Sequence, residues 1–171
     1  TESARLTREE LMDPQSCSGC HPRHYREWSG SMHAYASEDP VFRAMNQRAQ
    51  RETGGELGEF CVKCHAPLAL QEGATRDGSN LDEIPDKLKG VTCYFCHNAI
   101  DVGEHFNNDV KLANDTTLRA AIDQPLSSPA HGVAYSAFLD SDRRQSAVLC
   151  GSCHYVVTPA GVHLERTFDE Y

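Results

Sequence analysis

"CSGCHPRHYREWSGSMHAYA" (Cys17–Ala36) opens with two cysteines that are separated by two residues and followed at once by a histidine. The same C-x-x-C-H pattern occurs three more times along the chain. Its cysteines are Cys17, Cys20, Cys61, Cys64, Cys93, Cys96, Cys150 and Cys153. Its histidines are His21, His65, His97 and His154. These four motifs use all eight cysteines, and they decide what kind of fold the chain can form.

Three kinds of site contain paired cysteines with this spacing. Four C-x-x-C pairs could supply two zinc sites with four thiolates each, or four redox-active dithiols. Neither needs a histidine directly after each pair, whereas covalent attachment of c-type haem does. Histidine makes up 9 of 171 residues, so its presence in all four places by chance has a probability of about 10⁻⁵. The motifs therefore predict four haem c groups, bonded to the cysteines and ligated by the adjacent imidazoles.

The bulk composition narrows the partners and the location of the chain. A net charge of −9 argues against nucleic acid as a partner. The sequence contains no apolar run near the roughly 18 residues of a membrane-spanning helix. Haem is attached to C-x-x-C-H outside the cytoplasmic membrane, so we expect an extracellular or periplasmic protein whose signal peptide has been removed.

The density of haem predicts the fold class. With four haems in 171 residues, the porphyrins would form much of the core. We therefore expect a single domain over residues 1–171, mainly α-helical with extensive loops, whose short helices wrap round the cofactors. The predicted helices lie near residues 23–36, 40–53, 116–122 and 129–139, and before the fourth motif.

Two of these helices carry finer expectations. Asp39 is predicted to cap the helix that begins at Pro40, and Met45 is read as part of its apolar core stripe. Asp142 is predicted to cap the helix that carries the fourth motif.

Five histidines remain as candidate sixth ligands of the irons: His24, His33, His105, His131 and His163. Low-spin electron-transfer haem takes histidine or methionine in that position. The chain has only three methionines, and imidazole suits iron well. The sequence therefore favours ligation by two histidines at most irons, with five histidines available for four positions.

Several stretches resemble a known family. "CSGCHPRHYREWSGSMHA" resembles the first haem motif of the tetrahaem cytochrome c-554 family, which is related to the multihaem core of hydroxylamine oxidoreductase. "GVTCYFCH" (Gly90–His97) resembles its third motif. "SPAHG" and "LCGSCHYVVTPAGVHLERTFDEY" resemble its closing segment. The chain is also similar to subunits of extracellular tetrahaem cytochrome filaments, in which comparable haem arrangements stack end to end.

The resemblance implies sixth ligands for three haems. These are His33 for the third haem, His105 for the fourth and His131 for the first. The resemblance also places Trp28 in the matched pattern, and we expect this indole to pack on a porphyrin.

The second haem, ligated by His65, is left without a sixth ligand. His24 lies three residues after His21 on the same side of a helix, so it cannot reach the distal face of its own haem. In the c-554 arrangement the first and second haems lie at opposite ends of the row. We therefore predict that His24 ligates the second haem of a neighbouring subunit. His163 is the alternative ligand.

These predictions favour electron transfer over catalysis. We expect a filament subunit whose partners are further copies of itself, stacked end to end, together with redox proteins or extracellular electron acceptors. A soluble periplasmic shuttle is one alternative. A redox enzyme acting on a small molecule such as nitric oxide or hydroxylamine at a five-coordinate second haem is another. The third is a haem-binding module of a larger oxidoreductase.

Overall fold

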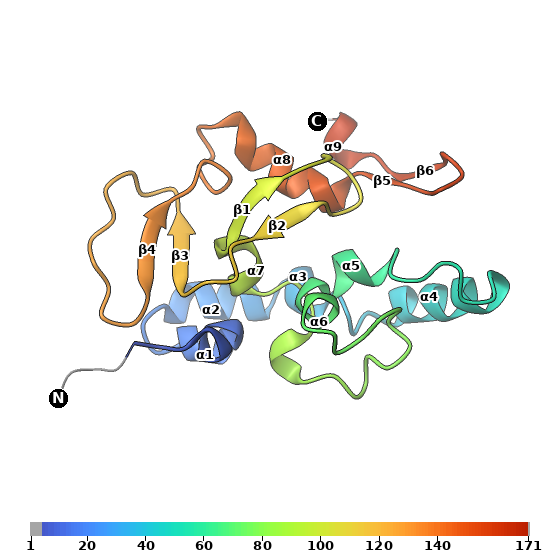
Figure 1. Cartoon of the computed structure of the whole chain (residues 1–171), viewed down its shortest axis with the longest axis horizontal. Helices are drawn as coiled ribbons and strands as arrows, with labels where there is room; N and C mark the ends of the chain where they lie inside the picture. Colours follow the sequence, from blue (N-terminus) through green and yellow to red (C-terminus); the bar gives the residue numbers. More distant parts are fainter. Residues whose placement is uncertain (1–4, 171) are drawn as a thin grey trace. The chain divides into compact units, whose positions relative to one another are not determined.

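The computed structural model describes residues 5–170, which form two compact units. The helical unit runs from Glu10 to Phe95. The sheet-bearing unit combines the residues up to Glu9 with those from Cys96 onward. Figure 1 follows the elements of both units along the sequence. No helix within residues 5–170 is both long and apolar enough to cross a membrane.

Short helices joined by loops make up the helical unit. Its α-helices are α1 (Arg8–Met12), which begins just before the unit, α2 (Pro22–Ser29), α3 (Met32–Tyr35), α4 (Pro40–Glu52), α5 (Val62–His65) and α6 (Pro67–Gln71). Its 3₁₀ helices are η1 (Pro14–Cys17) and η2 (Asp86–Leu88). Helix α7 (Cys93–His97) continues across the boundary between the units. The expectation of short helices with loops is confirmed, and the wrapping of cofactors stays a prediction.

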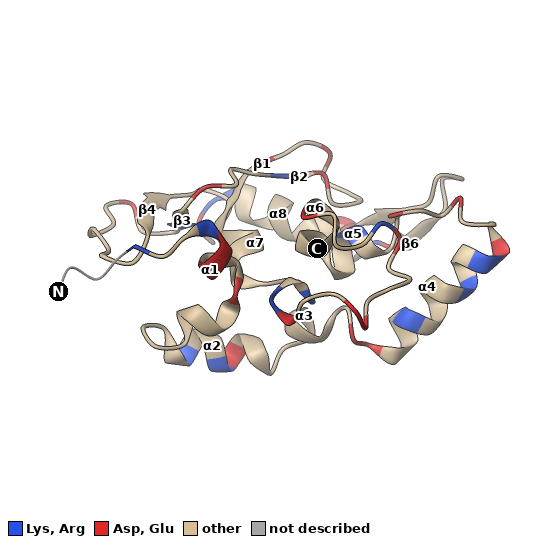
Figure 2. Ribbon diagram, turned by 60° about the horizontal axis from the view of Figure 1, so that its bottom comes forward, with Lys and Arg blue, Asp and Glu red and all other residues tan. Residues whose placement is uncertain are grey.

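The predicted start of α4 is confirmed. The Asp39 carboxylate accepts hydrogen bonds from the backbone N–H groups of Val41 and Phe42, at 2.7 and 3.0 Å. The expectation that Met45 is a core residue is wrong, because its side chain is 61% exposed. The helix buries Phe42 and Asn46 instead, which are one turn apart and so share a face. Figure 2 shows the basic residues spaced along the same helix.

The helix predicted near residues 23–36 is divided into α2 and α3. Gly30 ends α2, and Ser31 adopts an extended conformation with φ −96° and ψ 160°. The Ser31 hydroxyl donates to the Trp28 carbonyl at 2.7 Å and also caps α3. A serine that caps a helix competes with continuation of the preceding one, so His33 lies on a separate short helix.

Three two-stranded sheets distinguish the sheet-bearing unit. The strands are β1 (Ala99–Val102), β2 (Val110–Leu112), β3 (Thr117–Ala120), β4 (Gly132–Tyr135), β5 (Val156–Val157) and β6 (His163–Glu165). The pairs β1–β2 and β5–β6 are antiparallel, whereas β3–β4 is parallel. Figure 1 shows the arrows of β3 and β4 side by side and pointing the same way.

The strands β3 and β4 occupy segments that were predicted as helices, so those two predictions are wrong. Leu118 pairs with Val133 in the ladder, and Gly132 lies so close to Thr117 that a Cβ atom would come within 2.6 Å of its hydroxyl. Pairing between segments distant in the chain overrides local propensity here. Strand β3 alternates between polar and apolar residues over only four positions, and β4 does not alternate, so the pattern is too short to predict this pairing.

The helix that carries the fourth motif is confirmed, but its predicted cap is not. Helix α8 (Arg144–His154) starts two residues after Asp142, and Arg143 occupies the capping position. The Asp142 N–H instead donates to Asp140 at 3.0 Å. The chain ends in α9 (Thr167–Glu170).

Hydrophobic burial is uneven between the units. Most buried hydrophobic side chains belong to the helical unit, among them Met12, Leu68 and Tyr94. Within residues 5–170, only Ala99 and Leu149 belong to the sheet-bearing unit. Two buried apolar side chains are few for the core of a unit of this size. A bound porphyrin would supply further apolar surface.

Candidate functional site

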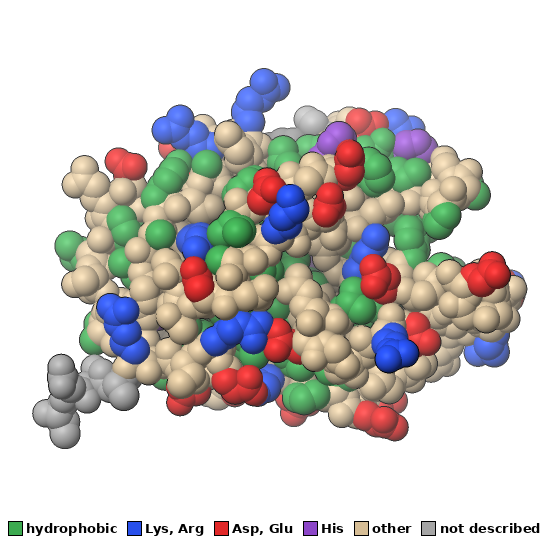
Figure 3. Space-filling view, in the orientation of Figure 1, with side chains coloured by type: hydrophobic (Ala, Val, Ile, Leu, Met, Phe, Trp, Pro, Cys, Tyr) green, Lys and Arg blue, Asp and Glu red, His purple; other side chains and the backbone are tan. Residues whose placement is uncertain are grey.

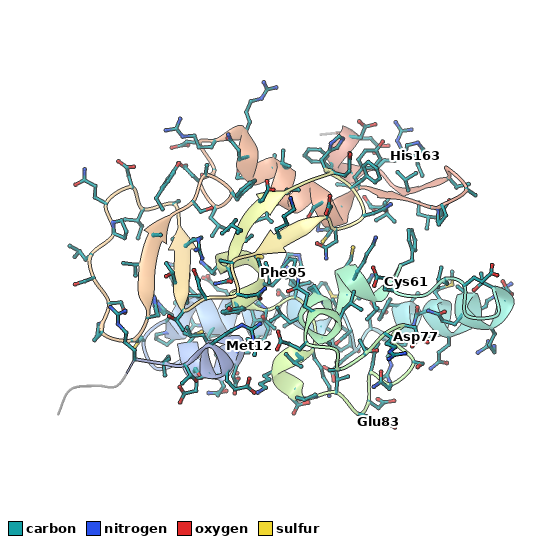
Figure 4. The ribbon with its side chains drawn as sticks, in the orientation of Figure 1. Met12, Cys61, Asp77, Glu83, Phe95 and His163 are labelled. Carbon is teal, nitrogen blue, oxygen red and sulfur yellow. The ribbon has the colours of Figure 1, made fainter. Side chains whose placement is uncertain are left out.

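The four C-x-x-C-H motifs lie on or beside short helices. The third motif forms all of α7, the fourth ends α8, and the second occupies α5 with Cys61 directly before it. Cys61 is labelled in Figure 4. Residues three apart on a helical turn face the same way, which suits two thioether bonds to one porphyrin. No disulfide joins any of the eight cysteines.

The environment of His65 orients its imidazole. Its Nδ1 lies 2.9 Å from the carbonyl oxygen of Ala36. A carbonyl can only accept, so Nδ1 carries the proton and Nε2 keeps its lone pair. The ring also stacks on Phe42, with 3.8 Å between centroids and an interplanar angle of 1°. Burial lowers the pKa of His65, which favours the neutral imidazole that a metal requires.

The same arrangement recurs at two other candidate ligands. His97 Nδ1 lies 2.5 Å from the Arg119 carbonyl oxygen. His131 Nδ1 lies 2.8 Å from the Gly132 carbonyl oxygen. Metal-binding histidines characteristically donate their second ring N–H to a backbone carbonyl, which fixes the tautomer and strengthens the ligand. These three imidazoles fit Nε2 ligation of haem iron, and their acceptors were not foreseen because backbone carbonyls carry no sequence signal.

Cysteines of different motifs approach one another. A hydrogen bond with Cys93 lowers the pKa of the Cys17 thiol to about 7, so the first and third motifs meet at these sulfurs. Burial, followed by nearby Cys153 and Cys150, raises the pKa of the Cys96 thiol to about 12. The third and fourth motifs therefore also lie close. This proximity is what electron exchange between neighbouring cofactors would require.

Helix α3 holds His33 against the segment that leads into the third motif. The Val91 N–H donates to the His33 carbonyl at 2.8 Å, and the Gly90 N–H donates to the Ser37 hydroxyl at 3.0 Å. The Trp28 indole N–H donates to the Val91 carbonyl at 2.8 Å. The position of Trp28 is thus fixed by a hydrogen bond, while its packing on a porphyrin stays a prediction.

Aromatic rings surround His105 beside the fourth motif. Its ring centroid lies 5.9 Å from those of Phe106 and Tyr155 and 6.0 Å from that of Phe168. Phe168 in turn covers Gly151, where a Cβ atom would come within 2.5 Å of the phenyl ring. Gly151 stands between the two cysteines of the fourth motif, so the structure brings His105 to that motif.

The loop that carries His105 is fastened to the fourth motif by backbone bonds. Asn107 and Asn108 both have positive φ angles, 56° and 51°. Their N–H groups donate to the carbonyls of Tyr155 at 3.0 Å and Ser152 at 2.5 Å. The Asn107 side chain bonds both polar groups of the Val157 backbone, at 2.8 and 2.9 Å. Consecutive asparagines were the available signal, because asparagine adopts this conformation more readily than most residues.

The two remaining candidates lie at the surface. His163 on β6 stacks on the Tyr155 ring at 5.6 Å with an interplanar angle of 17°, and Figure 4 labels it at the C-terminal hairpin. His24 on α2 is exposed and lies edge-on to His21, with ring centroids 6.0 Å apart. This contact agrees with the argument that His24 shares the proximal side of its own motif.

The zinc alternative lacks a preformed cluster. Among residues 5–170, no three or more His, Cys, Asp or Glu side chains are grouped so that they could hold a metal ion. Tetrahedral zinc sites need four converging ligands.

Comparison with known proteins agrees with this geometry. Residues 16–98 match the family described as cytochrome c554 and c-prime. A solved structure, a penta-heme cytochrome c552 from Thermochromatium tepidum, matches with a TM-score of 0.63 and 23% sequence identity. The family match covers just under half of the chain, and both matches are to proteins described as cytochromes c.

The structural match has a defined extent. It covers 97% of this chain but 50% of the cytochrome c552, so the chain spans half the length of that protein. At 23% identity the likeness shows a shared fold alone. No curated protein matches the sequence.

Proposed function

We propose that this chain is a multihaem cytochrome, which transfers electrons through four covalently bound haems c with most irons ligated by two histidines. The observation that carries the proposal is the shared orientation of three imidazoles. His65, His97 and His131 each direct Nδ1 to a backbone carbonyl and keep Nε2 for a metal. Each bound haem would supply one-electron redox chemistry at its iron.

The protein's own residues orient and enclose these groups. The acceptor carbonyls hold each imidazole plane, and stacking on Phe42 fixes the ring of His65. The aromatic side chains of Phe106, Tyr155 and Phe168 lie around His105, beside the fourth motif. Exclusion of solvent and hydrogen bonds to the ligands are the means by which a protein sets haem potentials.

The proposal is tested by counting haems and titrating them. Protein purified with its cofactors should carry four haems by intact mass, with one attached to each motif by peptide mapping. A spectroelectrochemical titration should resolve several one-electron steps, and the reduced protein should react weakly with carbon monoxide. Fewer haems than motifs would contradict the number proposed. Carbon monoxide bound at one haem, together with turnover of nitric oxide or hydroxylamine, would favour the enzyme alternative.

We propose His33, His105 and His131 as distal ligands of the third, fourth and first haems. The family resemblance names them. The contacts of α3 before the third motif and of the His105 loop with Tyr155 support two of these pairings.

Replacement of any one of these three histidines by alanine should leave four haems attached and convert one of them to high spin. The thioether bonds hold the cofactor, so loss of a distal imidazole changes the iron and not the haem count. The readouts are intact mass and the low-temperature electron paramagnetic resonance spectrum.

His163→Ala is the matched control for His105→Ala, because both rings contact Tyr155. We expect the spectrum of His163→Ala to stay low-spin. A fully low-spin spectrum in His105→Ala would remove that residue from the ligand set. A high-spin haem in His163→Ala would support the alternative ligand for the second haem.

We further propose a periplasmic or extracellular location and end-to-end association with further copies of the chain. The location follows from the c-type family, and the association follows from the resemblance to filament subunits. On the face shown in Figure 3, acidic and basic side chains are interspersed. That face offers no field of one sign that would steer a charged partner, which suits association through coordination and apolar contacts.

A further inference from the structure

A buried amide directly after the third motif organises the region that orients His97. Asn98 is fully buried. Its Nδ2 donates to the Asp115 carboxylate at 3.1 Å and to the Thr117 carbonyl at 3.2 Å, and its Oδ1 accepts from the Asn114 N–H at 2.6 Å. One side chain therefore makes four hydrogen bonds to the turn before β3 and to the first residue of that strand.

Asp115 in that turn forms an ion pair with Arg119 on β3, and the Arg119 side chain is little exposed. Arg119 donates to both oxygens of Asp115, at 3.2 and 2.9 Å, and its side chain is 15% exposed. A bidentate contact of this kind fixes the guanidinium geometrically. The carbonyl of the same Arg119 accepts a hydrogen bond from the His97 Nδ1–H. The ion pair and the hydrogen bond to the imidazole therefore share one residue.

We propose that the Asp115–Arg119 pair, held by Asn98, sets the reduction potential of the third haem through His97. The inference rests on the proposed haem at the third motif. Asn98, Asp115 and Arg119 are positioning residues, since none of them is a ligand. Their effect is electrostatic, exerted by two opposite charges on the segment whose backbone bonds the His97 imidazole.

The sign of each effect follows from charge. Ferric haem carries one more positive charge than ferrous haem, so a nearby positive charge favours reduction and a negative charge opposes it. Loss of the Asp115 charge leaves the guanidinium uncompensated and should raise the potential. Loss of the Arg119 charge leaves the carboxylate uncompensated and should lower it. Both charges lie in partly buried surroundings, where screening by solvent is weaker.

The test measures the reduction potential of the third haem in the intact holoprotein. Asp115→Asn should raise its potential and Arg119→Gln should lower it, each by up to about a tenfold change in the ratio of reduced to oxidised haem, or 59 mV. Arg119→Lys, which retains the charge, should restore most of the native value. The haem is assigned by comparison with His33→Ala, whose high-spin signal marks the same iron under the proposed ligation.

The pair Lys111 and Asp101 provides a matched control. It has a similar length, 2.8 Å, and lies in the same unit, but its side chains are 62% and 52% exposed. Asp101→Asn and Lys111→Gln should leave all potentials unchanged. Shifts of the potential in the same direction in Asp115→Asn and Arg119→Gln would overturn the proposal. Loss of packing, or of the His97 hydrogen bond, would shift the potential in the same direction in both variants. Unchanged potentials would overturn it as well. Absence of haem from the third motif would instead contradict the proposed function.

Discussion

Gly90→Ala is expected to destabilise the protein by about 2–5 kcal/mol, more than addition of a methyl group at most other glycines. Gly90 has a φ of +66°, and a Cβ atom there would lie 2.5 Å from the carbonyl oxygens of His33 and Ala34. These are backbone atoms, which cannot rotate away as a side chain could. The loss should appear as a lower free energy of unfolding in denaturant titrations of the holoprotein.

Gly73→Ala separates the contact from the backbone conformation. Gly73 has a similar φ of +70°, but no atom outside its chain neighbours lies within 4 Å of its Cβ position. It should lose only the roughly 1–2 kcal/mol of a left-handed residue with a side chain. The difference between the two variants therefore measures the approach of Gly90 to α3. Equal losses in the free energy of unfolding of the two variants would show that the added methyl group at Gly90 meets no costly clash with α3.

The same variant tests the placement of His33. Val91 is bonded to the His33 carbonyl, so displacement at Gly90 should move α3 away from the third motif. If His33 ligates the third haem, Gly90→Ala should add a high-spin signal that Gly73→Ala lacks. Retention of a fully low-spin spectrum in a destabilised variant would separate the fold of this segment from ligation.

Much of the candidate site could be predicted because its signal is local. The four motifs are read directly from the spacing of cysteine and histidine, and the cap at Asp39 depends on its own next three residues. Helix α4 follows from that cap and a following proline. Short-range chemistry of this kind survives in any tertiary context, so sequence patterns report it well.

The features that could not be predicted depend on contacts between residues that are distant in the sequence. The parallel pairing of β3 with β4 joins segments 15 residues apart, as in Thr117 and Gly132, and local propensity gives no account of it. The acceptors of the imidazole protons are backbone carbonyls, which every residue possesses. The exposure of Met45 was missed because helical spacing defines a stripe without saying which side of it meets the core.

The largest functional effect is expected from His24→Ala. His24 is exposed on α2, and its ring lies 6.0 Å from that of His21, on the proximal side of the first motif. An imidazole so placed cannot reach the distal face of its own haem, but it is accessible to another molecule. We propose that it ligates the second haem of a neighbouring copy, where His65 is the proximal ligand.

One coordination bond would then join two subunits and also supply the sixth ligand of the second haem iron. Loss of His24 should therefore abolish end-to-end polymers and leave one five-coordinate haem in each released monomer. The two effects should appear together, because they have the same cause. Electron microscopy measures the first effect, and carbon monoxide binding by the reduced protein measures the second.

Arg26→Gln is the matched control for His24→Ala, since it removes an exposed charge from the same helix and keeps the imidazole. Polymers and low-spin ligation should both persist in this variant. Addition of imidazole to His24→Ala should restore a six-coordinate spectrum without restoring polymers. Free imidazole completes the coordination of the iron but does not link two subunits. Polymers of His24→Ala with every haem six-coordinate would exclude this histidine. A monomeric native protein that binds no carbon monoxide would point to a ligand from its own chain, and His163→Ala would then be the variant to measure.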